Sequence, residues 1–169
     1  RESGARIVDA FAAGLAAERA GVRSAGVAPT PAVAWLAADA GLGGDRLAIR
    51  EDFDQVDRAA LLAACDVIVC PSREESFGMV IIEAWAARRP VVAADIDAVR
   101  STIERCPGGS LFPVDDAAAL AAAVGELVRD PDRAAAAGEA GRRLVEAEFG
   151  WPTIVDRWEA HLRRLVANP

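Results

Sequence analysis

The 169-residue sequence predicts a single α/β domain built on a doubly wound, parallel, Rossmann-like sheet. Two observations support this fold class. Short runs of valine, isoleucine and alanine alternate with longer stretches of helical periodicity. Proline and glycine signals separate these stretches at short intervals. Strands that are joined by right-handed crossover helices lie parallel, so helices should cover both faces of the sheet.

The first 65 residues combine clear and weak signals. Thr30 and Pro31 supply an N-cap and a first-turn proline for a helix, and the glycine cluster that begins at Gly41 ends it. The expected elements are, in order, a helix at 1–20, a strand at 22–28, a helix at 30–41, a strand at 47–49 and a helix at 56–65. Because no strand feeds the first helix, we expect the domain to lack its first strand.

The signals are stronger in the remainder of the chain. Asp115 or Asp116 caps one helix, and Asp130 followed by Pro131 starts the next. The expected elements are, in order, strands and helices at 66–70, 78–88, 90–94, 99–105 and 110–112, and then three helices at 116–129, 131–149 and 152–166. The last helix is amphipathic, and we expect it to pack at the edge of the domain through Trp151 and Trp158.

Composition excludes several classes of function. A net charge of −7 argues against a nucleic-acid-binding protein, which needs a basic face. Every basic residue is arginine, which excludes a Schiff-base lysine and a Walker-type phosphate-binding lysine. No apolar run approaches the roughly 20 residues of a transmembrane helix. The odd count of cysteines, without metal-type spacing, indicates reduced thiols in a cytoplasmic protein, with Cys65 and Cys70 in the core.

The most informative stretch is 66–94, which is typical of a strand, a loop, a helix and a second strand. Ligands of open α/β sheets bind beyond the carboxyl ends of the strands, so 71–78 should form the floor of a crevice. The first amides of the helix that follows lack internal partners and, together with the helix dipole, make an anion site. Gly78 lets a ligand approach the backbone closely.

Two carboxylates flank the start of this helix. Glu83 is the only charge within 78–87, and a lone buried carboxylate is costly without partners. One interpretation is that Glu83 accepts hydrogen bonds from two vicinal hydroxyls of a ligand, as carboxylates do for ribose. The alternative is that it faces solvent or pairs with a nearby arginine such as Arg50 or Arg100. For Glu75, a solvated loop charge and a site residue are equally supported.

The segment ESFGMVIIE, from Glu75 to Glu83, resembles the E-x7-E signature of the retaining GT-B glycosyltransferases of family 4. The flanking segments ACDVIVCPS and EAWAARRPVVAAD fit the same family, and the similarity extends from about Arg46 onward. The resemblance implies that the chain is one half of a GT-B architecture, the donor-binding half. Glu75 would be the catalytic residue that holds the donor sugar, and Glu83 would bind the ribose diol. The implied donor-binding residues between them are Ser76, Phe77, Gly78, Met79 and Val80.

The resemblance also implies a reaction. A hexose-type sugar would pass from a nucleoside diphosphate sugar to an unidentified acceptor with retention, without a cofactor or a metal. The family's N-terminal acceptor-binding domain is missing from this chain, as is the basic pair that grips the diphosphate, and Ser3 stands where lysine is common. We therefore expect the chain alone to be inactive and the enzyme to be cytoplasmic, with peripheral membrane association through the missing domain left open. In the family the last helix reaches toward the other domain, which would leave its apolar stripe exposed here.

A second hypothesis remains beside the enzyme. The chain would then be a non-catalytic Rossmann-like interaction module, or a degenerate orphan domain, that binds a partner protein through its sheet edge and last helix. A sugar-nucleotide epimerase should carry histidines in its cleft, whereas the only histidine, His161, lies in the last helix and is expected at the surface. Asp95 and Asp97 follow a strand end and are expected to cap the next helix. Phe53 is a candidate wall for a base pocket.

Overall fold

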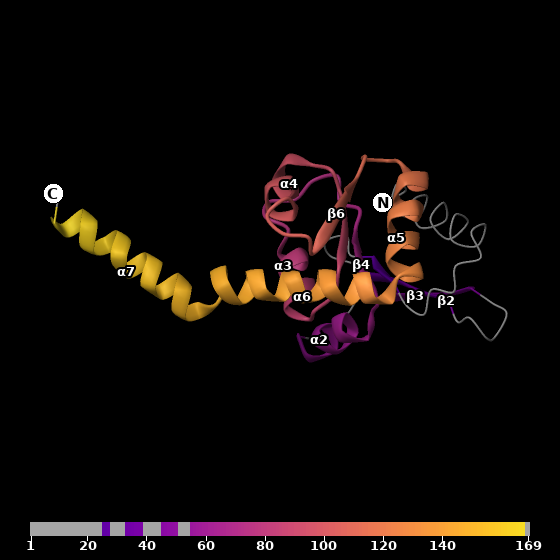
Figure 1. Cartoon of the computed structure of the whole chain (residues 1–169), viewed down its shortest axis with the longest axis horizontal. Coiled ribbons are helices and arrows are strands. Elements are labelled where there is room, and N and C mark those ends of the chain that lie inside the picture. The colour runs from indigo at the N-terminus through magenta and orange to yellow at the C-terminus, as the bar shows by residue number, and fades with distance from the viewer. Residues whose placement is uncertain (1–24, 28–32, 39–44, 51–54, 168–169) are drawn as a thin grey trace.

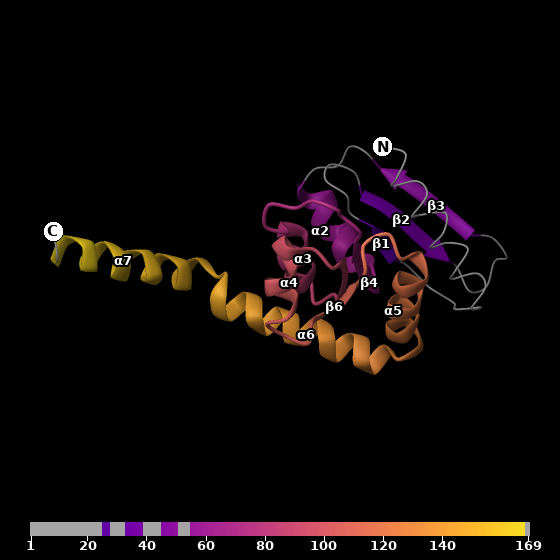
Figure 2. The ribbon, with the colours of Figure 1, turned by 90° about the horizontal axis from the view of Figure 1, so that it is seen from above.

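Figure 1 shows the computed structural model of the chain, which describes residues 25–27, 33–38, 45–50 and 55–167. The predicted helix at 1–20 and the candidate residues Ser3 and Phe53 lie outside the described residues. The described part is a layered α/β structure, with a sheet between helices and one helix that projects from it (Figures 1 and 2).

Six strands form one sheet in the order β3-β2-β1-β4-β5-β6. They are β1 (Ala25–Val27), β2 (Val33–Ala38), β3 (Asp45–Arg50), β4 (Val67–Cys70), β5 (Val91–Ala94) and β6 (Gly109–Phe112). β1, β4, β5 and β6 are parallel, as predicted. β2 and β3 are each antiparallel to their neighbours, so the expectation of a wholly parallel sheet is wrong at this edge. Antiparallel strands at the edge of an otherwise parallel sheet are common.

The helix predicted at 30–41 is wrong, because β2 occupies its centre. All six residues of β2 pair with β3, and three of them also pair with β1. The threonine–proline and glycine signals report only local preference. Strands on both sides of β2 supply hydrogen-bond partners for its backbone, and this tertiary pairing overrides a weak local preference.

The described helices lie at or within a few residues of their predicted positions. They are α2 (Gln55–Ala64), α3 (Met79–Ala86), α4 (Asp97–Ile103), α5 (Ala117–Arg129), α6 (Pro131–Glu148) and α7 (Trp151–Ala167). Two of the predicted caps are confirmed, because the side chains of Asp116 and Asp130 each accept a 2.9 Å hydrogen bond from a first-turn amide. These caps fix where α5 and α6 begin.

An apolar core lies on each face of the sheet. In β4, Val67 and Val69 belong to the core that includes α5, whereas Ile68 and Cys70 belong to the core that includes α3. This alternation follows from the two-residue period of a strand. Figures 1 and 2 show α5 on one side of the sheet and α3 and α4 on the other. The doubly wound arrangement is therefore confirmed.

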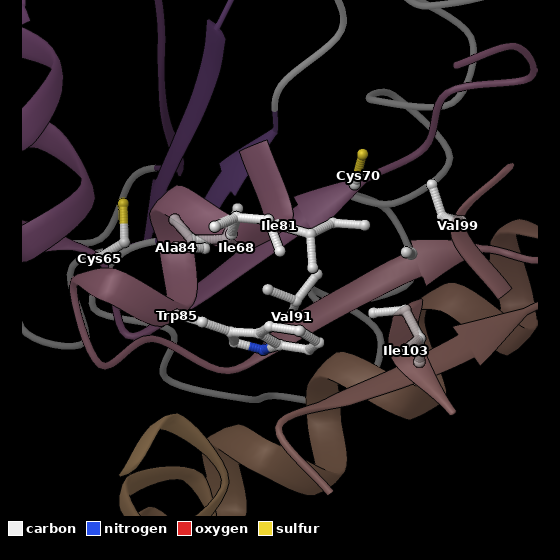
Figure 3. Close-up of a cluster of buried hydrophobic side chains, with 11 residues drawn as sticks. Cys65, Ile68, Cys70, Ile81, Ala84, Trp85, Val91, Val99 and Ile103 are labelled. Carbon is white, nitrogen blue, oxygen red and sulfur yellow. The ribbon is translucent and has the colours of Figure 1, made fainter. Parts of the chain in front are cut away.

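The core beneath α3 is centred on Trp85, which is fully buried (Figure 3). Its indole Nε1 donates a 2.8 Å hydrogen bond to the carbonyl oxygen of Gly108. α6 crosses α3 closely because Gly138 and Gly141 carry no side chain. A Cβ on Gly141 would overlap the Trp85 ring, and one on Gly138 would overlap the carbonyl oxygen of Arg88. This contact fixes the C-terminal end of α3.

α7 extends away from the sheet and contains no buried residue (Figures 1 and 2). Trp151 is 78% exposed and Trp158 is 62% exposed, so the expectation that they pack this helix onto the domain is wrong. The helix follows the end of α6 and continues outward, so no face of the sheet lies beneath it. Its apolar stripe is exposed, which is the alternative that the resemblance implied. None of the described helices is long and apolar enough to cross a membrane.

Candidate functional site

The candidate site lies at the carboxyl edge of the sheet, which we define as the edge where β4, β5 and β6 end. The loop at 71–78 leaves β4 at this edge and leads into α3. The loops that precede α4 and α5 leave β5 and β6 at the same edge. Since open α/β sheets bind ligands beyond the carboxyl ends of their strands, this edge is where a ligand is expected.

Gly78 determines how the chain enters α3. It is the N-cap, with φ 74° and ψ 44°, in the left-handed region that glycine tolerates best. A Cβ at this position would lie 3.0 Å from Cγ1 of Val99 and 3.1 Å from Cδ1 of Ile81. Because glycine offers no side-chain acceptor, no side chain caps α3. The amides of Met79 and Val80 are thus available to an acceptor from outside the helix.

Exposed apolar side chains border this helix end. Phe77 is 46% exposed and Met79 is 55% exposed. Phe77 packs edge to face against Phe149, with the ring centroids 6.2 Å apart, which holds the Phe77 ring beside the start of α3. Ser76 is exposed and Val80 is half-buried. Apolar surface with a few convergent polar groups is typical of a small-molecule site.

Glu75 lies in the loop before α3 and is half-buried. The hydroxyl of Ser72 donates a 2.8 Å hydrogen bond to Oε1 of Glu75. The carboxylate is therefore held by its own loop instead of being free in solvent. Of the two interpretations of Glu75, an oriented carboxylate at the carboxyl edge fits this geometry better than a solvated charge.

Glu83 is paired with Arg58 of α2, whose Nη2 donates to Oε2 of the carboxylate. The alternative interpretation expected an ion pair with a nearby arginine, and the structure shows one; the arginine is Arg58, whereas Arg50 and Arg100 were the examples given. The side chain of Arg50 lies outside the described part of the chain. The contact joins residues 25 positions apart, so no local pattern identifies it. One signal was available: Arg58 precedes two inward-facing leucines by three and four residues, which places all three on one helix face.

The environment of Glu83 acts on its ionisation in two directions. Burial raises the pKa of the carboxyl above its ordinary value, and the nearby charge and hydrogen bond of Arg58 lower it. Burial has the larger effect, so the pKa of Glu83 is raised on balance. Arg58 thus partly offsets the effect of burial and favours the anionic form of the carboxyl, which is the form that accepts hydrogen bonds at both oxygens.

Two further arginines at the carboxyl edge are ion-paired. Arg73 donates from Nε and Nη2 to Oδ1 of Asp115 at 2.9 and 2.5 Å. Arg100 donates to Asp95 at 2.7 Å and to Asp97 at 3.0 Å. The expectation that Asp95 and Asp97 cap α4 through their side chains is wrong, since α4 has no side-chain cap and both carboxylates face Arg100.

The remaining candidates for chemistry do not join this site. Cys65 and Cys70 are buried, as predicted, and burial raises the pKa of Cys65 to about 12 and also raises that of Cys70. Both thiols are therefore poor nucleophiles. His161 is exposed beside Trp158, as predicted. Within the described residues, no group of three histidines, cysteines or acids is arranged to hold a metal ion.

Comparison with known proteins identifies the family. The model of the group 1 glycosyl transferases matches residues 5–130. This chain belongs to the group 1 glycosyltransferases. It is 36% identical over 132 residues to a D-inositol 3-phosphate glycosyltransferase of Thermobispora bispora, covering 78% of this chain and 30% of that protein. It is 38% identical over 113 residues to the alpha-maltose-1-phosphate synthase of Mycobacterium tuberculosis, covering 63% and 29%.

The solved structures agree with this assignment. The sucrose-phosphate synthase of Thermosynechococcus elongatus superimposes with a TM-score of 0.64 at 35% identity, over 71% of this chain and 30% of that one. Anabaena HepE in complex with UDP and glucose superimposes with a TM-score of 0.55 at 26% identity, over 62% and 29%. The predicted fold, a Rossmann-like half of a GT-B architecture, is thus confirmed. The chain spans about 30% of the length of these relatives.

Proposed function

We propose that this domain binds the nucleoside diphosphate sugar donor of a retaining glycosyltransferase. The observation that carries the proposal is the start of α3, where a left-handed Gly78 leaves the first amides without a side-chain cap. Two oriented carboxylates, Glu75 and Glu83, flank these amides. Family membership supports the class of reaction, and the UDP and glucose named with the Anabaena structure support the class of donor.

Each group in the site has a distinct task in this proposal. Glu75, oriented by Ser72, accepts hydrogen bonds from hydroxyls of the donor sugar and helps to position its anomeric carbon. The amides of the segment 76–80 contact the diphosphate and sugar hydroxyls, where the helix dipole favours negative charge. Glu83 accepts hydrogen bonds from the ribose diol. Phe77 and Met79 border the site with apolar surface.

The chemistry follows from this placement. The bond between the anomeric carbon and the diphosphate oxygen breaks, and an acceptor hydroxyl forms a new bond to that carbon on the same face. The proton of the hydroxyl passes to the departing diphosphate. The amides at the start of α3 stabilise the charge that develops on the diphosphate, so the proposal requires neither a metal nor a cofactor.

We also propose that catalysis requires a second domain that binds the acceptor. Positioning of two substrates across a cleft supplies much of the rate of such a transfer, and this chain covers about 30% of its relatives. The chain alone is therefore expected to bind the donor and to transfer sugar slowly or not at all. The buried reduced thiols are consistent with a cytoplasmic enzyme.

Calorimetric titration of the whole chain with UDP, GDP and ADP tests donor binding. We expect one of these nucleotides to bind, and Glu83→Ala to weaken it about tenfold, because a hydrogen bond to a charged group contributes about 1.5 kcal/mol or more. Glu126→Ala is the matched control, since Glu126 also pairs with an arginine across two helices but lies at the far end of α5 from the site. If no nucleotide binds at millimolar concentration, the proposed function is wrong.

A further inference from the structure

We propose that Arg58 is a positioning residue for the carboxylate of Glu83, holding it in the orientation in which it receives the ribose diol. The proposal rests on the donor-binding function above. Arg58 extends from α2 to α3 and donates from Nη2 to Oε2 of Glu83. Among the described residues it is the only partner of this carboxylate. Arg58 lies outside the E-x7-E signature.

The geometry leaves one oxygen of Glu83 for a ligand. Arg58 occupies Oε2, and Oε1 has no partner among the described residues. A carboxylate has about four lone-pair sites, so one guanidinium bond still allows it to accept two hydroxyls. Fixing one oxygen removes rotation about the last torsion of the side chain, and this pre-organisation reduces the entropy that is lost when the diol binds.

Exposure distinguishes this ion pair from those of Arg73 and Arg100 at the carboxyl edge. The side chains of Arg58 and Glu83 are 33% and 29% exposed, against 54% and 51% for Arg73 and Asp115. The pair of Arg100 with Asp95 lies between them, at 42% and 38%. Exposed ion pairs are screened by water and contribute little. The pair on Glu83 is the least exposed of these ion pairs, so water screens it least and it has the largest effect on its carboxylate.

The charge of Arg58 also favours the form of Glu83 that a diol requires. Burial favours the neutral acid and raises the pKa of Glu83, whereas Arg58 opposes this shift. A protonated carboxyl offers fewer acceptor sites for hydroxyl donors than the anion. Removing Arg58 takes away the opposing effect, so the pKa of Glu83 should rise further. As the pH is lowered, the variant should therefore lose diol binding at a higher pH than wild type does.

A blocking role for Arg58 makes a different prediction. In that role Arg58 would occupy the diol site and would have to leave Glu83 before the nucleotide binds. Removing the guanidinium would then tighten nucleotide binding, whereas a positioning residue gives the reverse. The structure favours positioning because Oε1 of the carboxylate has no partner among the described residues while the ion pair is intact, and the Glu83 side chain is 29% exposed.

The test compares UDP with 2′-deoxy-UDP, which lacks one hydroxyl of the diol, on the whole chain. Wild type should prefer UDP about tenfold or more. In Arg58→Gln we expect the preference to shrink toward onefold while 2′-deoxy-UDP binding changes less than about twofold. Arg58→Lys should restore part of the preference, because it returns the charge but not the planar donor. Arg133→Gln, which removes an arginine from the α5–α6 ion pair, is the matched control and should behave like wild type.

A second measurement does not depend on a ligand. An NMR titration of the Glu83 side-chain carboxyl should give a higher pKa in Arg58→Gln than in wild type and in Arg133→Gln. An unchanged pKa, an unchanged preference for UDP, or tighter UDP binding in Arg58→Gln would each overturn the role of Arg58. Failure of wild type to bind any nucleotide, or to distinguish the two nucleotides, would instead reject the proposed donor site, and the role of Arg58 with it.

Discussion

The two ends of α3 are built in opposite ways. At the N-terminal end, Gly78 leaves the helix without a side-chain cap, and Phe77 and Met79 are about half exposed. At the C-terminal end, Trp85 is fully buried and donates its indole hydrogen bond, and Gly141 of α6 contacts its ring. The comparison teaches that α3 is fixed from one end, so that the amides of its other end can be held in place and still remain free for a ligand.

The largest effect is expected where α6 meets the fixed end. Gly141→Ala places a methyl carbon 2.2 Å from Cδ1 of the fully buried Trp85, so the ring or the backbone of α6 must shift. We expect the free energy of unfolding to fall by about 3 kcal/mol, as overpacking of a dense core does. Urea denaturation of the variant measures this loss.

The control for this variant is Gly150→Ala. A Cβ on Gly150 would lie 3.2 Å from the carbonyl oxygen of Glu146 and 3.9 Å from Cδ of Pro152, outside the core. Its effect should stay within about 0.5 kcal/mol. Equal stability of the two alanine variants would show that α6 does not fix the end of α3.

The next largest effect concerns the indole hydrogen bond. Trp85→Phe removes the Nε1 donor, so the buried carbonyl of Gly108 keeps only the 3.1 Å hydrogen bond from the amide of Val91. The lost hydrogen bond costs about 1 kcal/mol, and the smaller ring leaves a gap that costs about as much again. We expect a loss of about 2 kcal/mol in urea denaturation. Trp151→Phe, at a position 78% exposed, should change stability little; a similar loss in both would contradict the comparison.

The sequence predicted much of this region because its signals are local. The strand that ends at Cys70, the start of the helix at Gly78 and the caps Asp116 and Asp130 each follow from a few neighbouring residues, and all of them are found within a residue of their predicted positions. Close packing of helices depends on glycines of α6, Gly138 and Gly141, whose positions leave no space for a Cβ. Which helix these glycines contact depends on the path of the chain, and no local pattern contains it.

The errors have the same origin. β2 carries helix signals at its start and end, but pairing with two strands decides its conformation. For Glu83 the residue type indicated a need for a partner, yet the partner, Arg58, comes from α2, 25 positions away in the sequence. α7 shows the converse case, since its amphipathic pattern predicted a packed helix although no surface of the described residues lies beneath it. Non-local partners are what a single sequence leaves undetermined.

At the N-terminal end of α3, we expect a substitution to change stability less and nucleotide binding more. Gly78→Ala puts a side chain on a residue with φ 74° and brings its Cβ within 3.0 Å of Val99. A left-handed conformation costs roughly 1–2 kcal/mol for a residue with a Cβ. Relief of this strain would rotate the first amides of α3. We therefore expect the free energy of unfolding to fall by roughly 1–2 kcal/mol. Nucleotide affinity, measured by calorimetry, should fall at least tenfold. Full affinity in this variant would contradict the role of the amides.

The smallest effect is expected just beyond the fixed end, and its sign is the informative part. Arg88 follows the C-cap of α3 with φ 57°, the position at which helices favour glycine. Its guanidinium pairs at 3.0 Å with Glu139, but both side chains are well exposed, so the ion pair contributes little. Arg88→Ala and Arg88→Gly both lose this pair, and only glycine relieves the left-handed strain. In urea denaturation, the free energy of unfolding of Arg88→Gly should therefore exceed that of Arg88→Ala by about 1 kcal/mol. Inside a helix the order is the reverse, because alanine is there the more stable of the two. If alanine were the more stable, the left-handed turn after α3 would not be a fixed part of the end that holds the helix.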